Sequence, residues 1–158
     1  MGEKARDVMA KQFFTLRPET TIATAVQVFR QASQEMRQKV FGLMVTDPDG
    51  RLVGMLSMYD ILLLIRPKHT HIWGEMSDLE LDGLFAAACQ RGKGIQVGDI
   101  MTTDLITVTP DAPLLLIIDI MIKKHVRRIP VLEDGRVVGI VYLSTVFDRL
   151  LDRLAGAG

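Results

Sequence analysis

The chain has little of several features that would assign it to a particular class of protein. It has one cysteine, Cys89, which excludes an intramolecular disulfide framework and a thiolate metal cluster. Its 19 basic and 19 acidic side chains cancel, so it lacks the basic excess of proteins that bind phosphate backbones. No apolar run approaches the roughly 20 residues that a membrane-spanning helix needs. We therefore expect no membrane insertion and no nucleic acid as the main partner.

The N-terminal residues are not predicted to form a signal peptide. Met1–Lys11 carries charges where a signal peptide would need an apolar core, so we expect a cytoplasmic protein. What is present is a globular composition, with 48% hydrophobic and 24% charged residues in a chain of 158. That length is enough for one compact domain, or for two very small ones that share a core.

The most informative feature is an internal repeat. Two blocks recur in the same order and with the same internal spacing. Asp7–Met9 with Phe14–Glu19 reappears as Asp99–Met101 with Ile106–Asp111, and Asp49–Leu56 reappears as Asp134–Val141. The chain therefore contains two copies of one unit, which we place at residues 1–65 and 98–158.

Each copy is predicted to run strand, helix, strand, strand, helix. In the first copy Thr20 or Thr21 caps a helix that extends through Gln31 to Lys39. An Asp-Gly turn joins the middle strands as a hairpin. The strands are expected near 43–45, 53–56, 129–132 and 138–141, and the closing helices near 58–65 and 144–154. The connector, residues 66–97, is too long for a structureless loop and predicts an extra helix ended by Gly92 and Gly94.

The motifs resemble a tandem pair of CBS domains, often called a Bateman module. They are the Asp-apolar-Met opening, the strand entry with Thr and Pro, the Asp-Gly hairpin and the Gly54–Asp60 junction. The resemblance implies an α/β (α+β) fold: two β-α-β-β-α repeats related by a pseudo-two-fold axis, with clefts between them. It also implies a homodimer, shaped as a flat disc.

The same resemblance implies a regulatory module rather than an enzyme. Such a module would need no cofactor and would bind AMP, ADP, ATP or S-adenosylmethionine. It would signal to a separate enzyme or transporter. The alternative is a dimeric interaction scaffold that binds no small molecule. We find no nucleophile with a base, no phosphate-cradling loop and no metal set that would indicate catalysis.

The Gly54–Asp60 junction is the main candidate for ligand chemistry. Asp60 lies in the first turn of its helix, and a carboxylate can accept hydrogen bonds from both hydroxyls of a ribose. Ser57 stands at the helix entrance, where its hydroxyl suits a phosphate. The alternative is that both residues only cap the helix. The resemblance adds the Met55 backbone beside the adenine, and Ile106 and Thr107 from the other copy.

A basic cluster, Lys123–Arg128, follows the first helix of the second copy. The resemblance matches His125 and Arg128 to phosphate contacts, and a guanidinium can bind two phosphate oxygens at once. The alternative is a solvated helix end whose cations offset the helix dipole.

The second junction departs from the pattern, because Tyr142 replaces the small hydroxyl and Thr145 replaces the carboxylate. We therefore expect one competent site and one degenerate site, the latter comprising Thr15, Ile140, Tyr142 and Thr145. His69 and His71 are too few for a metal site. Trp73 is expected to anchor the connector, and Cys89 to be buried.

Overall fold

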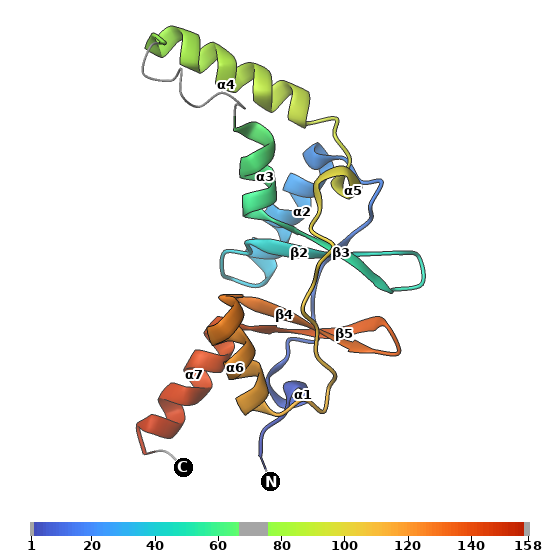
Figure 1. Ribbon diagram of the computed structural model, residues 1–158, viewed down its shortest axis with the longest axis vertical. Helices are drawn as coiled ribbons and strands as arrows, with labels where there is room; N and C mark the ends of the chain where they lie inside the picture. The colour runs from blue at the N-terminus through green and yellow to red at the C-terminus, as the bar shows by residue number, and fades with distance from the viewer. Residues whose placement is uncertain (1, 67–75, 157–158) are drawn as a thin grey trace. The chain divides into compact units, whose positions relative to one another are not determined.

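The structure is a computed structural model that describes residues 2–66 and 76–156 (Figure 1). The predictions for His69, His71 and Trp73 lie outside these residues. The described residues group into two compact units, each of which takes residues from both copies. The first-copy unit lies within Phe14–Pro48 and Val53–Asp104. The second-copy unit lies within Met1–Phe13, Asp49–Leu52 and Leu105–Gly158.

The first-copy unit has a three-stranded sheet ordered β1-β2-β3. β1 runs parallel to β2, with Thr15 opposite Met44. α2, α3 and α5 lie on one side of β2 and β3 (Figure 1). The elements are β1 (Thr15–Leu16), α2 (Ile22–Glu35), β2 (Gly42–Thr46), β3 (Leu52–Ser57), α3 (Met58–Ile65), α4 (Asp78–Gly92) and α5 (Val97–Ile100). The predicted cap at Thr21 is confirmed, since its side chain accepts a hydrogen bond from the Thr24 N–H.

The connector helix is confirmed as α4, and it contacts α3. A Cβ added at Gly92 would lie 3.3 Å from both Leu64 and Ile65, so the small residue lets the two helices approach closely. Cys89 is half-buried on this helix rather than fully buried as expected.

The prediction that the first long helix extends to Lys39 is wrong. α2 ends at Glu35, and Arg37 follows in the left-handed region with φ 54°. A left-handed residue stops an α-helix and turns the chain. The Ser33 hydroxyl then accepts the Val40 N–H at 3.0 Å, and this bond carries the chain toward β2.

The second-copy unit contains a two-stranded antiparallel hairpin. Its elements are α1 (Ala5–Val8), α6 (Leu114–Lys124), β4 (Arg128–Glu133), β5 (Arg136–Tyr142) and α7 (Leu143–Leu154). Asp134 and Gly135 both have positive φ, at 54° and 79°, as a two-residue hairpin turn of the primed type requires. The leading strand expected in this copy is reduced to one parallel bridge between Val108 and Val131.

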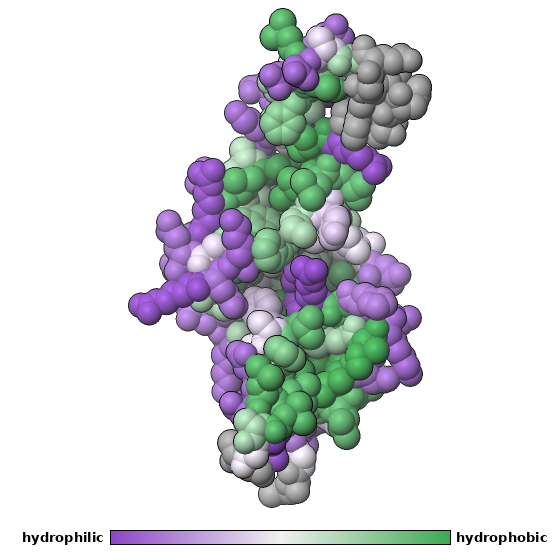
Figure 2. Space-filling model, turned by 90° about the vertical axis from the view of Figure 1, so that its left-hand side faces the viewer, coloured by the Kyte–Doolittle hydropathy of each residue, from purple (hydrophilic) through white to green (hydrophobic). Residues whose placement is uncertain are grey.

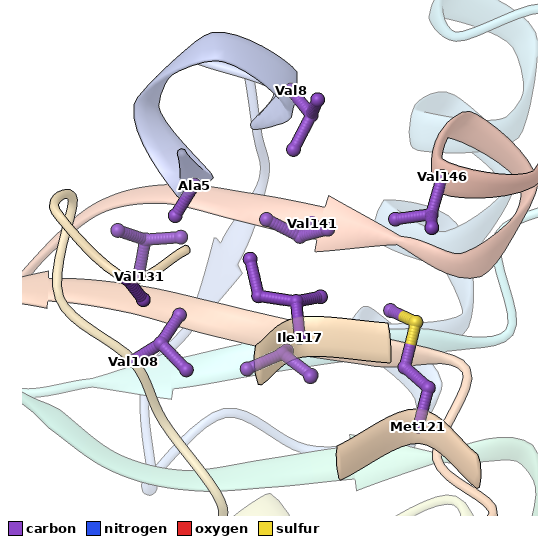
Figure 3. Packing of buried hydrophobic residues seen from close by; sticks show 10 residues of the cluster. Ala5, Val8, Val108, Ile117, Met121, Val131, Val141 and Val146 are labelled. Carbon is purple, nitrogen blue, oxygen red and sulfur yellow. The ribbon is translucent and has the colours of Figure 1, made fainter. Parts of the chain in front are cut away.

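The core of the second-copy unit includes side chains from the beginning of the chain. Ala5 and Val8 of α1 lie among Ile117, Val131 and Val141 (Figure 3). Backbone hydrogen bonds support this packing, from the Ala5 N–H to Ala112 at 2.8 Å and from the Leu114 N–H to Glu3 at 2.9 Å. An ion pair between Arg149 and Glu3 ties the same segment to α7.

The first-copy unit is completed in the same way by the opening segment of the second copy. Val97 of α5 is fully buried with Leu16 and Leu56, and its N–H donates to the Thr20 carbonyl at 2.7 Å. Burial of a side chain of this size stabilises the fold by about 1.5–3 kcal/mol. Each copy therefore lends its Asp-apolar-Met segment to the core built around the other copy.

Candidate functional site

The Ser57 and Asp60 side chains form a capping box at the start of α3. The Ser57 N–H and hydroxyl both donate to Asp60 Oδ2, at 2.8 and 3.1 Å. The Asp60 N–H donates back to Ser57 Oγ at 3.3 Å. These bonds satisfy donors that a helix start otherwise leaves unpaired. They also hold the carboxylate in one orientation.

A third residue contacts this carboxylate, and the sequence analysis missed it. The Thr102 hydroxyl donates to Asp60 Oδ1 at 3.1 Å. Thr102 is held there by two backbone hydrogen bonds with Met55, one in each direction and both 2.9 Å long. Thr102 directly follows the second Asp-apolar-Met opening, so the signal was present as a hydroxyl where the first copy has Ala10.

The glycine in each hairpin accommodates the methionine that ends the Asp-apolar-Met segment of the other copy. A Cβ at Gly54 would lie 2.5 Å from Met101 Sδ, and a Cβ at Gly139 would lie 2.5 Å from Met9 Sδ. The methionine therefore lies directly against a strand that has no side chain at that point. This contact brings the following residue, Thr102, beside Met55 in the first-copy unit.

The second-copy unit repeats this backbone arrangement without the polar groups. Ile140 pairs with Ala10 through hydrogen bonds of 2.8 and 3.1 Å, as Met55 pairs with Thr102. Tyr142 precedes α7 and makes no side-chain cap. Thr145 occupies the position of Asp60, and the first turn of α7 has no acidic residue. The Asp60 carboxylate of the first-copy unit thus corresponds to Thr145 in the second-copy unit, and the Thr102 hydroxyl corresponds to Ala10.

A half-buried cation distinguishes the second-copy unit. Arg128 begins β4 directly opposite Tyr142 of β5. Burial lowers the pKa of the Arg128 guanidinium, although Tyr142 offsets part of that change. Burial likewise raises the pKa of the Tyr142 phenol, and Arg128 reduces that rise. A guanidinium that has lost part of its hydration gains more from a bound anion than a fully exposed one.

The rest of the basic cluster is exposed at the end of α6. His125 terminates that helix in the left-handed region, with φ 54°. Lys123 pairs with Asp119 at 3.1 Å one turn earlier. In the first-copy unit, β2 begins with Gly42, whereas β4 of the second-copy unit begins with Arg128. The two units therefore carry different charges where these strands begin.

The predicted site residues divide between the units. The first-copy unit holds Thr15, Met55, Ser57 and Asp60, and the second-copy unit holds Ile106, Thr107, His125, Arg128, Ile140, Tyr142 and Thr145. Contacts within the units join Ser57 to Asp60 and pair Arg128 with Tyr142. Thr107 is exposed and Ile106 is half-buried.

The part of the chain that the structure describes has neither a cluster of metal ligands nor a membrane-spanning helix. Among residues 2–66 and 76–156, no three His, Cys, Asp or Glu side chains gather as metal ligands would. Over the same ranges, no helix combines the length and the apolar composition needed to cross a bilayer.

Comparison with known proteins matches both copies. The CBS domain family model matches residues 5–67 and 97–152. The protein MJ1426 of Methanocaldococcus jannaschii is 25% identical over 158 residues, which cover 92% of this chain and 90% of that protein. Two further relatives from that organism, MJ1225 and an inosine-5'-monophosphate dehydrogenase, are each 24% identical. The chain spans only 44% and 23% of their lengths.

Solved structures share the fold. CBSX2 from Arabidopsis thaliana, in complex with AMP, has a TM-score of 0.70 and 27% identity, over 97% of this chain and 99% of that one. The CBS domain pair of MJ0100, solved with 5'-methylthioadenosine and S-adenosyl-L-methionine, has a TM-score of 0.65 and 22% identity. That alignment covers 98% of this chain and 99% of that pair.

Proposed function

This chain belongs to the CBS domain family, as a tandem pair, and from that premise we propose that it is a regulatory module that binds an adenine nucleotide. The proposal depends most on the Asp60 carboxylate, which three hydrogen bond donors hold in a fixed orientation. A fixed carboxylate suits a ribose hydroxyl, because no further ordering is needed when the ligand binds. The AMP complex of CBSX2, a relative that aligns with nearly the whole chain, supports the choice of nucleotide.

Each predicted residue has a role in this proposal. Asp60 accepts a ribose hydroxyl, while Ile106 and Thr107 flank the base beside Met55. The Ser57 hydroxyl already donates to Asp60, so Ser57 acts by fixing that carboxylate. We therefore assign the phosphate to Arg128, with His125 as a second contact.

We propose a single competent site. The set comprising Thr15, Ile140, Tyr142 and Thr145 has no carboxylate for a ribose. Tyr142 adds a bulky ring where the first copy has Ser57. A nucleotide bound there would lose the charged acceptor and would meet the partly buried Tyr142 phenol.

Calorimetric titration with AMP, ADP, ATP and S-adenosylmethionine tests the proposal. Asp60→Asn keeps an oxygen for the cap but removes the charge, and it should weaken nucleotide binding about tenfold to a hundredfold. Thr145→Ala, at the corresponding position of the other copy, should leave the affinity unchanged. The proposal fails if wild-type protein binds none of the four compounds, or if the two variants bind equally well.

The second candidate function is a dimeric scaffold that binds no small molecule. It is favoured by exposed apolar side chains on α7, where Leu143, Phe147, Leu151 and Leu154 recur at helical spacing. Figure 2 shows a broad apolar area in its lower half, where Figure 1 has α6 and α7. We propose that this face pairs two copies of the chain under either function. The regulated enzyme or transporter would be a separate partner.

A further inference from the structure

Asp60 alone offers too few acceptor positions for a ribose diol. A carboxylate has about four lone-pair positions. Ser57 fills two of them on Oδ2, and Thr102 fills one on Oδ1. One position therefore remains, on Oδ1, whereas the diol presents two hydroxyl donors.

Thr102 can supply the missing acceptor. A threonine hydroxyl has one hydrogen and two lone pairs. Because its hydrogen is directed at Asp60, the lone pairs are the part of the hydroxyl that a ligand can meet. Thr102 is exposed, and its Oγ1 lies 3.1 Å from Asp60 Oδ1. Two acceptors thus stand side by side, as two neighbouring hydroxyls on a sugar ring require.

We infer that Thr102 is a ribose-binding residue, with one diol hydroxyl donating to Asp60 Oδ1 and the other to Thr102 Oγ1. This inference rests on the proposed nucleotide-binding function and adds to it the basis for selecting ribose over deoxyribose. Loss of either hydroxyl from the ligand leaves one polar acceptor without its donor, and a site of this kind rejects such analogues strongly.

The acceptor pair is held before any ligand arrives. Both backbone bonds between Thr102 and Met55 are 2.9 Å long, and Met101 lies against Gly54 one residue earlier. The capping box fixes Asp60 through its other carboxylate oxygen, Oδ2. Groups held in this way cost little further conformational entropy on binding.

The other copy provides an internal comparison. At the positions of Thr102 and Asp60 it has Ala10 and Thr145, on the same backbone pairing to Ile140. That unit lacks both the hydroxyl at the first position and the carboxylate at the second. Selection for ribose is therefore expected from the first-copy unit.

The test measures the affinity of wild type, Thr102→Val, Thr102→Ser and Thr103→Val for AMP, 2'-deoxy-AMP and 3'-deoxy-AMP by calorimetry. Thr102→Val keeps the shape of the side chain and removes the hydroxyl, so AMP should bind about three- to tenfold more weakly. Thr102→Ser should restore wild-type affinity. Thr103→Val, which alters the exposed neighbouring residue, should change nothing. Thermal unfolding without ligand should show that each variant folds.

The deoxynucleotides separate direct contact from a merely structural effect. One deoxynucleotide should bind wild type and Thr102→Val equally, because it lacks the hydroxyl that donates to Thr102. The other should still bind Thr102→Val more weakly than wild type. An equal loss for all three ligands, or no loss of AMP affinity, overturns the ribose contact and leaves the proposed function standing. If wild type binds none of AMP, ADP, ATP and S-adenosylmethionine, both the ribose contact and the proposed function are overturned.

Discussion

Replacement of Gly139 by alanine should destabilise the protein, and the structure indicates by how much. The new Cβ would lie 2.5 Å from Met9 Sδ, 2.8 Å from Met9 Cγ and 3.1 Å from the Ala10 carbonyl oxygen. Its φ is not in the left-handed region, so the cost is steric and not conformational. The methionine can move only by giving up its packing against β5. The Ala10 carbonyl can move only by weakening the hydrogen bond that it accepts from the Ile140 N–H.

Overpacking of this kind costs about 1–3 kcal/mol, and the fixed carbonyl puts Gly139→Ala in the upper half of that range. For a chain of this size, each kcal/mol lowers Tm by about 2–4 °C, so we expect a fall of about 5–10 °C. Circular dichroism during thermal unfolding measures it. Gly83→Ala is the matched control: its Cβ meets nothing within 4 Å in the interior of α4, and it should stabilise by about 0.5–1 kcal/mol.

A double-mutant cycle identifies the cause. If the clash with Met9 is responsible, Gly139→Ala should cost less than half as much in a Met9→Ala background as in wild type. The reasoning is refuted if Gly139→Ala has the same Tm as wild type. It is also refuted if the substitution lowers the free energy of unfolding equally in the wild-type and Met9→Ala backgrounds.

Two further predictions concern other parts of the second-copy unit. Burial raises the pKa of Tyr142, so the folded state favours the neutral phenol. The stability that the neutral phenol contributes is fully present below the ordinary pKa of about 10, and it is lost as the pH rises through the raised pKa. The phenolate absorbance of wild type minus that of Tyr142→Phe should therefore have its midpoint above pH 10, and higher still in an Arg128→Gln background; a midpoint at or below 10 contradicts this. For the proposed dimer, Leu151→Glu places a charge in the α7 face and should weaken self-association at least tenfold in sedimentation experiments, while Leu79→Glu on α4 should not. A monomeric wild type would rule that interface out.

Most of the local structure could be predicted because its signals are local. The Asp-Gly turns, the Thr21 cap and the glycine-terminated connector helix each depend on a few neighbouring residues. The capping box of Ser57 and Asp60 was likewise readable from a spacing of three. The end of α2 was missed because nothing in the apolar pattern marks Arg37 as left-handed.

The missed features depend on contacts between distant residues. The Thr102–Asp60 hydrogen bond spans 42 positions, and no spacing rule connects two such residues. The exchange of opening segments was missed for a related reason. Alignment of the copies shows that Met9 and Met101 correspond, but it does not show which copy contains the glycine that each methionine contacts. The assignment of every site residue to a ligand, including Ile106, Thr107 and His125, stays a prediction.

The lending of α1 and α5 between the copies has a consequence for the origin of the chain. A polypeptide that carried one copy could not complete its own core. It would have to exchange its Asp-apolar-Met segment with that of a second molecule, as in a domain-swapped dimer. Gene duplication and fusion would then join two partners that already depended on each other. Afterwards the junction residues of the two copies could diverge, since the reciprocal exchange kept both halves folded, and today the first turn of α3 carries a carboxylate whereas the first turn of α7 does not.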